Sequence, residues 1–235
     1  MILEANKISK SYGKKQILHD IDVEINTRNI NGLLGPNGAG KTTFFYILAG
    51  LLHPSNGNII FDNSLITKKS IKERADLGIV YLPQEPSIFR ALSVFDNVKS
   101  ALEIKKMNKK DLNYKTEEIL QEFDIESIAL QKGNELSGGQ RRRVEIARSI
   151  ALNPKFIMLD EPFAGIDPIA IQELKKLIEK LSKKGLGILI SDHNVKATME
   201  ICEEIFVINQ GSIISKGTPE EVSQNEMVKK TYLGE

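Results

Sequence analysis

Apolar and polar residues alternate with different periods in different parts of the chain, and these periods predict its elements. Between Ile21 and Ile25 the alternation is strict, which is typical of a strand with one buried face. Other short, mostly apolar runs have the length of strands rather than helices. They predict strands at Ile30–Leu34, Gly78–Leu82, Phe156–Leu159 and Gly187–Ile190.

Helical spacing of apolar residues separates these predicted strands. Helix-forming residues extend from Lys41 to about Leu51, and helical spacing dominates from about Ser93 to Ala151, which predicts a mostly helical insert. Asp167 followed by Pro168 predicts a helix start, with the aspartate as N-cap. The inner face of that helix is predicted to carry Leu174, Leu177, Ile178 and Leu181.

The last part of the chain contains turn and capping patterns. Ile205–Ile208 and Ser212–Ser215 flank the dipeptide Gln210-Gly211, a spacing that predicts a hairpin. Thr218–Glu221 fits a capping box and predicts a short C-terminal helix. Because strands and helices alternate, we expect a largely parallel sheet covered on both faces, with ligands bound beyond the carboxyl ends of its strands.

Composition limits the class of protein. The chain has 235 residues, enough for one large α/β domain, and its 32 Lys and Arg residues nearly balance its 31 Asp and Glu residues. This balance gives no basis for expecting nucleic acid as a partner. Cys202 is the only cysteine, which suits a reducing cytosol. We find no signal-peptide pattern and no apolar run near the roughly 20 residues that span a bilayer, so we expect other chains to supply any membrane-spanning helices.

A glycine-rich loop between a predicted strand and a predicted helix carries the clearest chemistry. It fits G-x-x-x-x-G-K-[ST] without a mismatch. Glycines let the backbone wrap closely around phosphates, Lys41 would neutralise the β- and γ-phosphates, and the Thr42 hydroxyl would be a Mg²⁺ ligand. The alternative is a chance turn, which the flanking strand and helix disfavour. The predicted nucleotide-binding residues here are Gly35, Pro36, Asn37, Gly38, Ala39, Gly40, Lys41, Thr42 and Thr43.

Two adjacent carboxylates follow the predicted strand Phe156–Leu159. Asp160 is suited to hold Mg²⁺, and Glu161 is suited to orient the attacking water or to accept its proton. Two acids at the end of a strand can also form a solvated turn or a helix cap. The phosphate loop upstream favours the catalytic interpretation, because both features are expected at the same edge of the sheet.

A second phosphate-binding pattern lies in Leu136–Gln140, here called the signature segment. Ser137 is a suitable N-cap, and the two glycines after it expose the first N–H groups of the following helix. The sequence Leu-Ser-Gly-Gly-Gln resembles the signature of ABC ATPases, a family in which it faces the phosphate loop of a second copy. The resemblance implies a head-to-tail homodimer that encloses two ATP molecules. The implied nucleotide contacts of this segment are Ser137, Gly138, Gly139 and Gln140.

Further motifs of this family occur in the expected order over nearly the whole chain. Tyr12 resembles the aromatic residue that stacks on adenine, and Gln84 resembles the glutamine that contacts Mg²⁺ and water and senses the membrane partner. Asp167 resembles the aspartate that communicates across the dimer, and His193 resembles the histidine that contacts the γ-phosphate. Without the other motifs, Tyr12 would indicate ordinary packing and His193 would indicate a structural histidine. Gln84 alone would indicate no function.

The resemblance implies a single ABC ATPase domain over residues 1–235. Its expected fold is the α/β P-loop NTPase fold, with a RecA-like core, an N-terminal antiparallel β subdomain and a helical insert subdomain at about residues 93–151. The implied catalytic residues are Glu161, His193 and Gln84, and the implied Mg²⁺ ligands are Thr42, Gln84 and Asp160. The run Arg141–Arg143 is expected to be mostly solvated surface, because successive helical residues point in different directions.

Two classes of ABC protein remain open, a transport motor and a soluble ATPase that acts on nucleic acid or ribosomes. The single phosphate loop, the lack of a large insertion and the near-neutral charge favour transport. Among transport ATPases, the branched-chain amino-acid importers are the alternative to the lipopolysaccharide exporters. Gln140 differs from the Glu that many export ATPases carry, which leaves the assignment unchanged. The segments similar to the export ATPases are Tyr81–Arg90, Arg141–Arg148, Asp160–Pro168, Ser191–Val195 and Tyr232–Glu235.

This second resemblance implies a subunit on the cytoplasmic face of the inner membrane that powers lipopolysaccharide extraction with ATP and Mg²⁺. Two integral membrane subunits are expected to dock near Gln84–Arg90, and no direct contact with the transported substrate is expected. Phe89 is the candidate contact, because it is apolar in a segment expected to be exposed. Ordinary core packing of Phe89 is the alternative.

Overall fold

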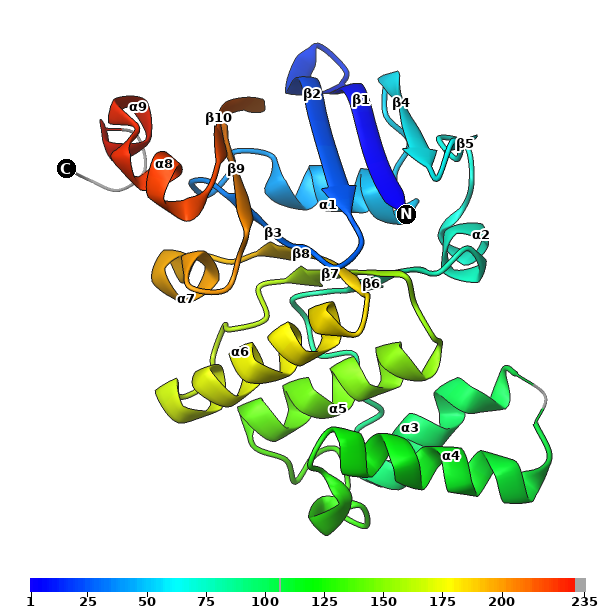
Figure 1. Ribbon diagram of the computed structural model, residues 1–235. Helices are drawn as coiled ribbons and strands as arrows, with labels where there is room; N and C mark the ends of the chain where they lie inside the picture. Colours follow the sequence, from blue (N-terminus) through cyan, green and yellow to red (C-terminus); the bar gives the residue numbers. More distant parts are fainter. Residues whose placement is uncertain (106, 231–235) are drawn as a thin grey trace.

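The computed structural model describes residues 1–105 and 107–230, and Figure 1 shows two sheets above a group of helices. The export-like ending Tyr232–Glu235 lies outside the described residues. The larger sheet has the strand order β10-β9-β3-β8-β7-β6. Its strands are β3 (Ile30–Leu34), β6 (Ile79–Leu82), β7 (Phe156–Asp160), β8 (Gly187–Ser191), β9 (Glu204–Asn209) and β10 (Ser212–Gly217).

Neighbouring strands of the larger sheet are parallel, except that β10 pairs antiparallel with β9. Every residue of β3, β7 and β8 is buried, as expected of strands covered on both faces. The prediction of a largely parallel, doubly covered sheet is therefore confirmed. Because these strands are parallel, their carboxyl ends meet at one edge of the sheet, which holds the segments that follow them.

The predicted hairpin near the end of the chain is also confirmed. Asn209 pairs with Ser212, so Gln210 and Gly211 alone form the turn between β9 and β10. Their φ angles of 46° and 80° are the left-handed values that a two-residue type I′ turn requires. A Cβ atom at Gly211 would lie 2.1 Å from the carbonyl oxygen of Ile17, so glycine is needed there for space as well.

The smaller sheet is antiparallel and has the order β2-β1-β4-β5. The predicted strand Ile21–Ile25 is the last part of a longer strand, in which Ile21, Val23 and Ile25 are buried. Register shifts interrupt the pairing of β1 with β2, and each shift changes which residues face inward. The strands are β1 (Ile2–Tyr12), β2 (Lys15–Asn26), β4 (Asn56–Phe61) and β5 (Ser64–Leu65).

The helix that follows the phosphate loop, α1 (Lys41–Ala49), lies between the two sheets (Figure 1). Phe44, Phe45 and Ile47 are fully buried in an apolar cluster that includes residues of both sheets. The helix ends before the predicted Leu51, because Gly50 caps it in the left-handed conformation with φ of 81°. Apolar packing on both sides thus fixes the helix that carries the loop.

Helices cover the other face of the larger sheet, below it in Figure 1. Of these, α6 (Pro168–Lys183) follows the N-cap Asp167 and buries the four predicted apolar residues, so both predictions for it are confirmed. The Thr218 capping box is confirmed as well. The limits of a helical insert at about residues 93–151 stay a prediction. The other helices are α2 (Ile71–Asp76), α3 (Val94–Glu103), α4 (Lys109–Glu122), the 3-10 turn η1 (Glu126–Ile128), α5 (Gly138–Ala151), α7 (Val195–Met199), α8 (Pro219–Gln224) and α9 (Glu226–Val228).

The prediction that the run Arg141–Arg143 is mostly solvated is wrong for Arg142. This residue of α5 is only 6% exposed. Its guanidinium donates to the carbonyl oxygens of Pro83 at 3.0 Å and Asp160 at 2.9 Å, and it pairs with the Glu145 carboxylate at 3.2 Å. These partners replace most of the water that the buried cation loses, although its Nε has no hydrogen-bond partner among the described residues.

Arg74 of α2 is fully buried, and it has no carboxylate partner among the described residues. Its guanidinium donates to five carbonyl oxygens at 2.6 to 3.1 Å. Two of them belong to Ile47 and Leu48 in the last turn of α1, where helix carbonyls lack partners and favour a cation. Burial lowers the pKa of Arg74 to about 10, so the side chain remains a cation at neutral pH. Arg74 therefore anchors the far end of the phosphate-loop helix.

We expect Arg74→Ala to lower the free energy of unfolding by about 3–5 kcal/mol, because it leaves several buried carbonyl groups unsatisfied and opens a cavity. Urea denaturation followed by circular dichroism measures the change. Lys72→Ala, at an exposed position of the same helix, is the matched control, and we expect it to cost less than about 0.5 kcal/mol. Equal effects of the two substitutions would show that Arg74 does not anchor α1.

Candidate functional site

The predicted phosphate loop follows the carboxyl end of β3 and is closely packed against neighbouring strands. A Cβ atom at Gly35 would lie 2.1 Å from the carbonyl oxygen of Ile208, and one at Gly40 would lie 2.6 Å from Cδ2 of Leu18. Gly40 also has a φ of 110°, a value that other residues rarely adopt. The glycines at these positions are therefore required by the shape of the loop itself.

Lys41 begins α1, and its side chain turns back into the loop. Its Nζ donates to the carbonyl oxygens of Gly35 at 2.7 Å and Pro36 at 3.1 Å. Burial lowers the pKa of Lys41, and the nearby carboxylates of Glu161 and Asp160 oppose that effect. The loop thus holds a partly desolvated cation close to the two carboxylates. Of the other predicted loop residues, Asn37, Gly38 and Thr42 are exposed and Thr43 is half-buried.

The turn of the β9–β10 hairpin supports the loop from one side. The N–H of Gly211 donates to the carbonyl oxygen of Ala39 at 2.9 Å, and the carbonyl oxygen of Gly211 accepts from the N–H of His19 at 2.8 Å. The sequence signalled a hairpin at Gly211 but gave no sign of this contact, which joins residues far apart in the chain.

Asp160 is the last residue of β7 and is 5% exposed. Burial raises the pKa of its carboxyl group. Its Oδ2 accepts a hydrogen bond of 3.0 Å from the Tyr81 hydroxyl, which belongs to the neighbouring strand β6. Sequence reasoning missed Tyr81, although it stands three positions before the predicted Gln84. The bond fixes the orientation of the carboxylate.

Glu161 has a φ of 47°, the left-handed conformation that an L-residue other than glycine seldom adopts. Its N–H donates to the carbonyl oxygen of Ser191 at 2.6 Å, which holds this backbone next to the end of β8. Its Oε2 accepts a bond of 2.6 Å from Gln84 Nε2 and lies 3.3 Å from Nδ1 of His193. The fold therefore brings the three predicted catalytic side chains together at one carboxylate oxygen.

Asp192 is a buried carboxylate that sequence reasoning left without a role. Its Oδ2 accepts from the N–H of Phe163 at 2.8 Å, and its Oδ1 accepts from the N–H of Asn194 at 2.7 Å. These bonds tie the segment after Glu161 to the segment that carries His193. The side chain thus positions both loops relative to each other.

Ser137 is the N-cap of α5, as predicted. Its hydroxyl accepts from the N–H of Gln140 at 3.3 Å, and the Gln140 side chain accepts from the N–H of Ser137 at 3.0 Å. Gln140 therefore completes a capping box. A Cβ atom at Gly139 would lie 2.6 Å from Cβ of Ala170, so this glycine allows α5 to pack closely against α6.

Tyr12, Ser137 and Asp167 have no hydrogen bond or ion pair with the side chains of the phosphate loop in the described part of the chain. Asp167 caps α6 by accepting from two backbone N–H groups at 2.9 and 3.0 Å. Tyr12 is 52% exposed at the end of β1, where Nζ of Lys10 lies 5.2 Å from the centre of its ring. One chain thus brings the phosphate loop and the predicted catalytic residues together. Its signature segment makes no bond to the loop side chains in the described residues, although Gly138 lines the same pocket as Gln84 and Glu161.

Comparisons with known proteins identify similar chains over the full length. A family model described as ABC transporter matches residues 18–164. The lipopolysaccharide export system ATP-binding protein LptB of Haemophilus influenzae is 49% identical over 235 residues, which cover 100% of this chain and 98% of that protein. A solved nucleotide-free ATP-binding cassette from an ABC transporter has a TM-score of 0.90 at 29% identity, covering 100% of this chain and 99% of the other. A dimeric bacterial ABC transporter cassette has a TM-score of 0.82 at 25% identity, covering 92% and 98%.

The close packing at Gly139 leads to a double-mutant test. We expect Gly139→Ala to lower the free energy of unfolding by about 1–3 kcal/mol, because its new methyl group overlaps that of Ala170. In the double variant with Ala170→Gly, the loss in the free energy of unfolding should be smaller than the sum of the two single losses by about 0.5 kcal/mol or more. Urea denaturation of the four proteins gives the coupling energy. Strictly additive effects would contradict the proposed overlap.

Proposed function

The chain belongs to the ABC transporter family as an ATP-hydrolysing subunit, and we propose that it powers the export of lipopolysaccharide. The observation that carries this proposal is the 49% identity to a lipopolysaccharide export ATPase over the whole chain. The geometry of the site is consistent with the hydrolytic part of the proposal, since the phosphate loop, two carboxylates, Gln84 and His193 meet at one edge of the sheet.

We assign ATP binding to the phosphate loop and Mg²⁺ binding to the oxygen atoms of Thr42, Asp160 and Gln84. Mg²⁺ usually takes one or two carboxylates and completes its shell with phosphate oxygens and water. The donor set fits this pattern, because Asp160 is a buried carboxylate held in one orientation by Tyr81. Bound Mg²⁺ would neutralise charge on the phosphates. Tyr12 would provide a face for the adenine ring.

We assign the general-base role to Glu161. In this step a water oxygen forms a bond to the γ-phosphorus, the bond to the ADP oxygen breaks, and the water proton passes to the Glu161 carboxylate. Gln84 and His193 both lie within hydrogen-bonding range of the same oxygen of that carboxylate. They would orient it, and His193 would also reach the γ-phosphate. Lys41 would balance the charge of the phosphates, so most of the catalysis is positioning and electrostatics.

We propose that the complete site needs a second copy of the chain. The signature segment presents a helix N-terminus and a serine hydroxyl, groups that suit a phosphate, yet it makes no bond to the phosphate-loop side chains of its own chain within the described residues. A head-to-tail homodimer would bring Ser137 of one copy to the loop of the other, with Asp167 near the same interface. The likeness to a cassette solved as a dimer supports this arrangement.

We place the docking surface for two membrane subunits at Gln84–Arg90. Phe89 in this segment is 49% exposed, and the guanidinium of Arg148 lies 4.4 Å from the centre of its ring. The N–H of Ser87 donates to Glu145, and the carbonyl oxygen of Ser87 accepts from Arg148. Both partners belong to α5, so movement of this helix would be transmitted to the docking segment.

No helix in the described residues is both long enough and apolar enough to span a bilayer. We therefore assign the membrane passage to the partner subunits, and we propose a peripheral position for this chain on the cytoplasmic face of the inner membrane. Since the chain would act on its partners alone, it would contact neither nucleic acid nor the transported lipid.

We expect Glu161→Gln to keep ATP affinity within about threefold of the original and to reduce turnover by about 100-fold or more, because the amide cannot accept the water proton. The closed dimer should accumulate with ATP. Nucleotide binding, phosphate release and size-exclusion chromatography measure these effects. Glu117→Gln, which changes an exposed carboxylate of α4, is the control and should leave turnover unchanged. Near-normal turnover of Glu161→Gln would remove Glu161 from the assigned role.

The same variant identifies the transported substrate in cells. When Glu161→Gln replaces the native chain, newly made lipopolysaccharide should accumulate in the inner membrane, measured after membrane fractionation. Uptake of branched-chain amino acids should stay normal. The opposite pattern would favour the importer alternative and would refute lipopolysaccharide export while leaving the ATPase assignment intact.

We expect Phe89→Ala to reduce co-purification with the membrane subunits by about tenfold, because it removes the exposed apolar ring from the docking segment. Turnover of the isolated chain should remain unchanged. Leu130→Ala, which truncates an apolar residue that is 90% exposed elsewhere, is the matched control. Undiminished co-purification of Phe89→Ala would show that Phe89 is not a docking contact.

A further inference from the structure

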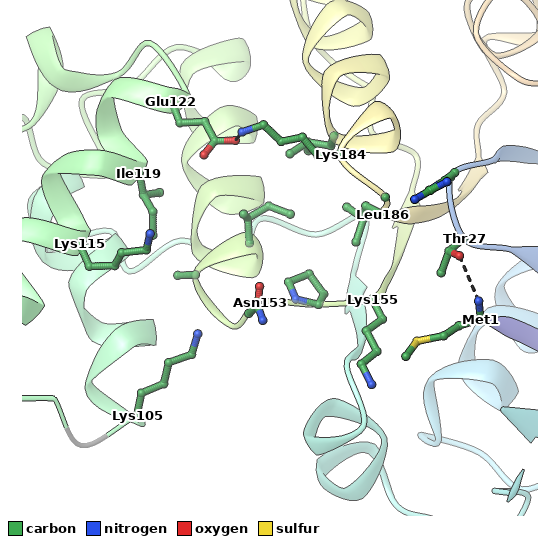
Figure 2. A pocket seen from close by; sticks show the side chains of 16 residues that line it. Met1, Thr27, Lys105, Lys115, Ile119, Glu122, Asn153, Lys155, Lys184 and Leu186 are labelled. Carbon is green, nitrogen blue, oxygen red and sulfur yellow. Dashed lines mark hydrogen bonds and ion pairs between the residues drawn. The ribbon is translucent and has the colours of Figure 1, made fainter. Parts of the chain in front are cut away.

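A cavity of about 540 Å³ opens where the parallel strands begin, at the edge of the sheet opposite the phosphate loop. Figure 2 shows that one side is formed by Lys105, Lys115 and Ile119, and the other by Lys155, Leu186 and Met1. One wall therefore comes from Lys105, just after α3, and from α4, and the other comes from the strand starts and the end of α6. None of its lining residues belongs to the site proposed for ATP.

The charges around this cavity are strongly unequal. Its lining includes one carboxylate, Glu122. It also includes the chain's amino terminus and five cationic side chains. These five are Arg28, Lys105, Lys115, Lys155 and Lys184. The whole chain is almost neutral, so this concentration is local. Such an excess produces a positive potential that attracts anions.

Nearby carboxylates balance only some of these cations. Glu122 pairs with Lys184, as Figure 2 shows, and Lys115 pairs at 2.7 Å with Glu118 outside the cavity. The side chains of Arg28 and Lys105 have no carboxylate partner among the described residues. Lys105 is an exposed residue, but partial burial lowers its pKa and repulsion from the nearby Lys115 cation lowers it further. A bound anion would relieve that repulsion.

Part of the cavity lining is apolar. It includes Ile119, Ile150, Leu181 and Leu186. A simple inorganic anion would leave this surface in contact with water, whereas a ligand with an apolar part would cover it. The volume lies within the range that is usual for small-molecule sites.

We propose that this cavity binds a small organic phosphate, with the phosphate beside Lys105 and Lys115 and a compact apolar body against the apolar part of the lining. Such a ligand would contact Lys105 and α4 on one side and the strand starts on the other. It would join two parts of the chain that Glu122 and Lys184 already connect by an ion pair. Binding would therefore stabilise their present relative position.

Isothermal titration calorimetry with 1-naphthyl phosphate tests the proposal on the full chain. We expect binding that weakens with added salt, that persists in Lys41→Gln, and that falls by about tenfold or more in the double variant Lys105→Gln/Lys115→Gln. The matched control is Lys109→Gln/Lys110→Gln, which removes two charges from exposed positions of the same helix outside the cavity lining. The control should keep its affinity within about twofold.

Three outcomes would overturn the proposal. They are absence of binding, binding lost in Lys41→Gln but kept in the cavity variant, and equal weakening by the cavity variant and its control. Unfolding of the cavity variant is checked by its melting temperature without ligand. That temperature should change little, because Lys105 and Lys115 are exposed and the surface ion pair of Lys115 with Glu118 contributes little to stability.

Discussion

The buried guanidinium of Arg142 is the interaction on which the arrangement of the site most depends. It extends from α5 to the carbonyl oxygens of Pro83 and Asp160, which lie just beyond β6 and at the end of β7. A buried cation is costly unless all its partners are in place, so the relative position of these three segments is closely restricted. Its partner Glu145 also accepts from the N–H of Ser87. Helix α5, the segment Gln84–Arg90 proposed for docking, and β7 are therefore linked through one pair of buried charges.

The phosphate loop is held by a separate set of contacts. Its helix α1 is packed between two sheets, its far end is bound by Arg74, and its backbone at Ala39 is supported by Gly211. The two groups of contacts meet at Glu161, whose carboxylate is near Lys41 and bonded to Gln84. A change in the position of α5 would thus reach Glu161, the carboxylate proposed as general base, through Gln84 without deforming the loop. Two separate groups of contacts that meet at Glu161 suit a site in which this carboxylate takes part in both nucleotide binding and mechanical coupling.

The sequence predicted most of the fold because the strands that carry the motifs are buried on both faces and appear as continuous apolar runs. It also predicted the caps at Asp167 and Thr218, since capping is local. Arg142 was misjudged because the two carbonyl groups that bury it lie 18 and 59 residues away, and its local partner Glu145 does not by itself distinguish it from its neighbours. Tyr81 was missed for the same reason, because its bond to Asp160 depends on the pairing of β6 with β7. The smaller sheet was only partly predicted, since register shifts break the alternation.

The near-zero net charge concealed a separation of charge between the two edges of the larger sheet. Asp160, Glu161 and Asp192 follow carboxyl ends of strands, whereas Arg28, Lys155 and Lys184 surround the strand starts. Part of this separation is expected, because α5 and α6 end at the second edge and each carries about half a negative charge there. Two helix ends could balance about one cation, and Glu122 balances one more. Arg28 and Lys105 are left without a compensating negative charge. A bound anion therefore accounts better than the helix ends for the cations that surround the cavity.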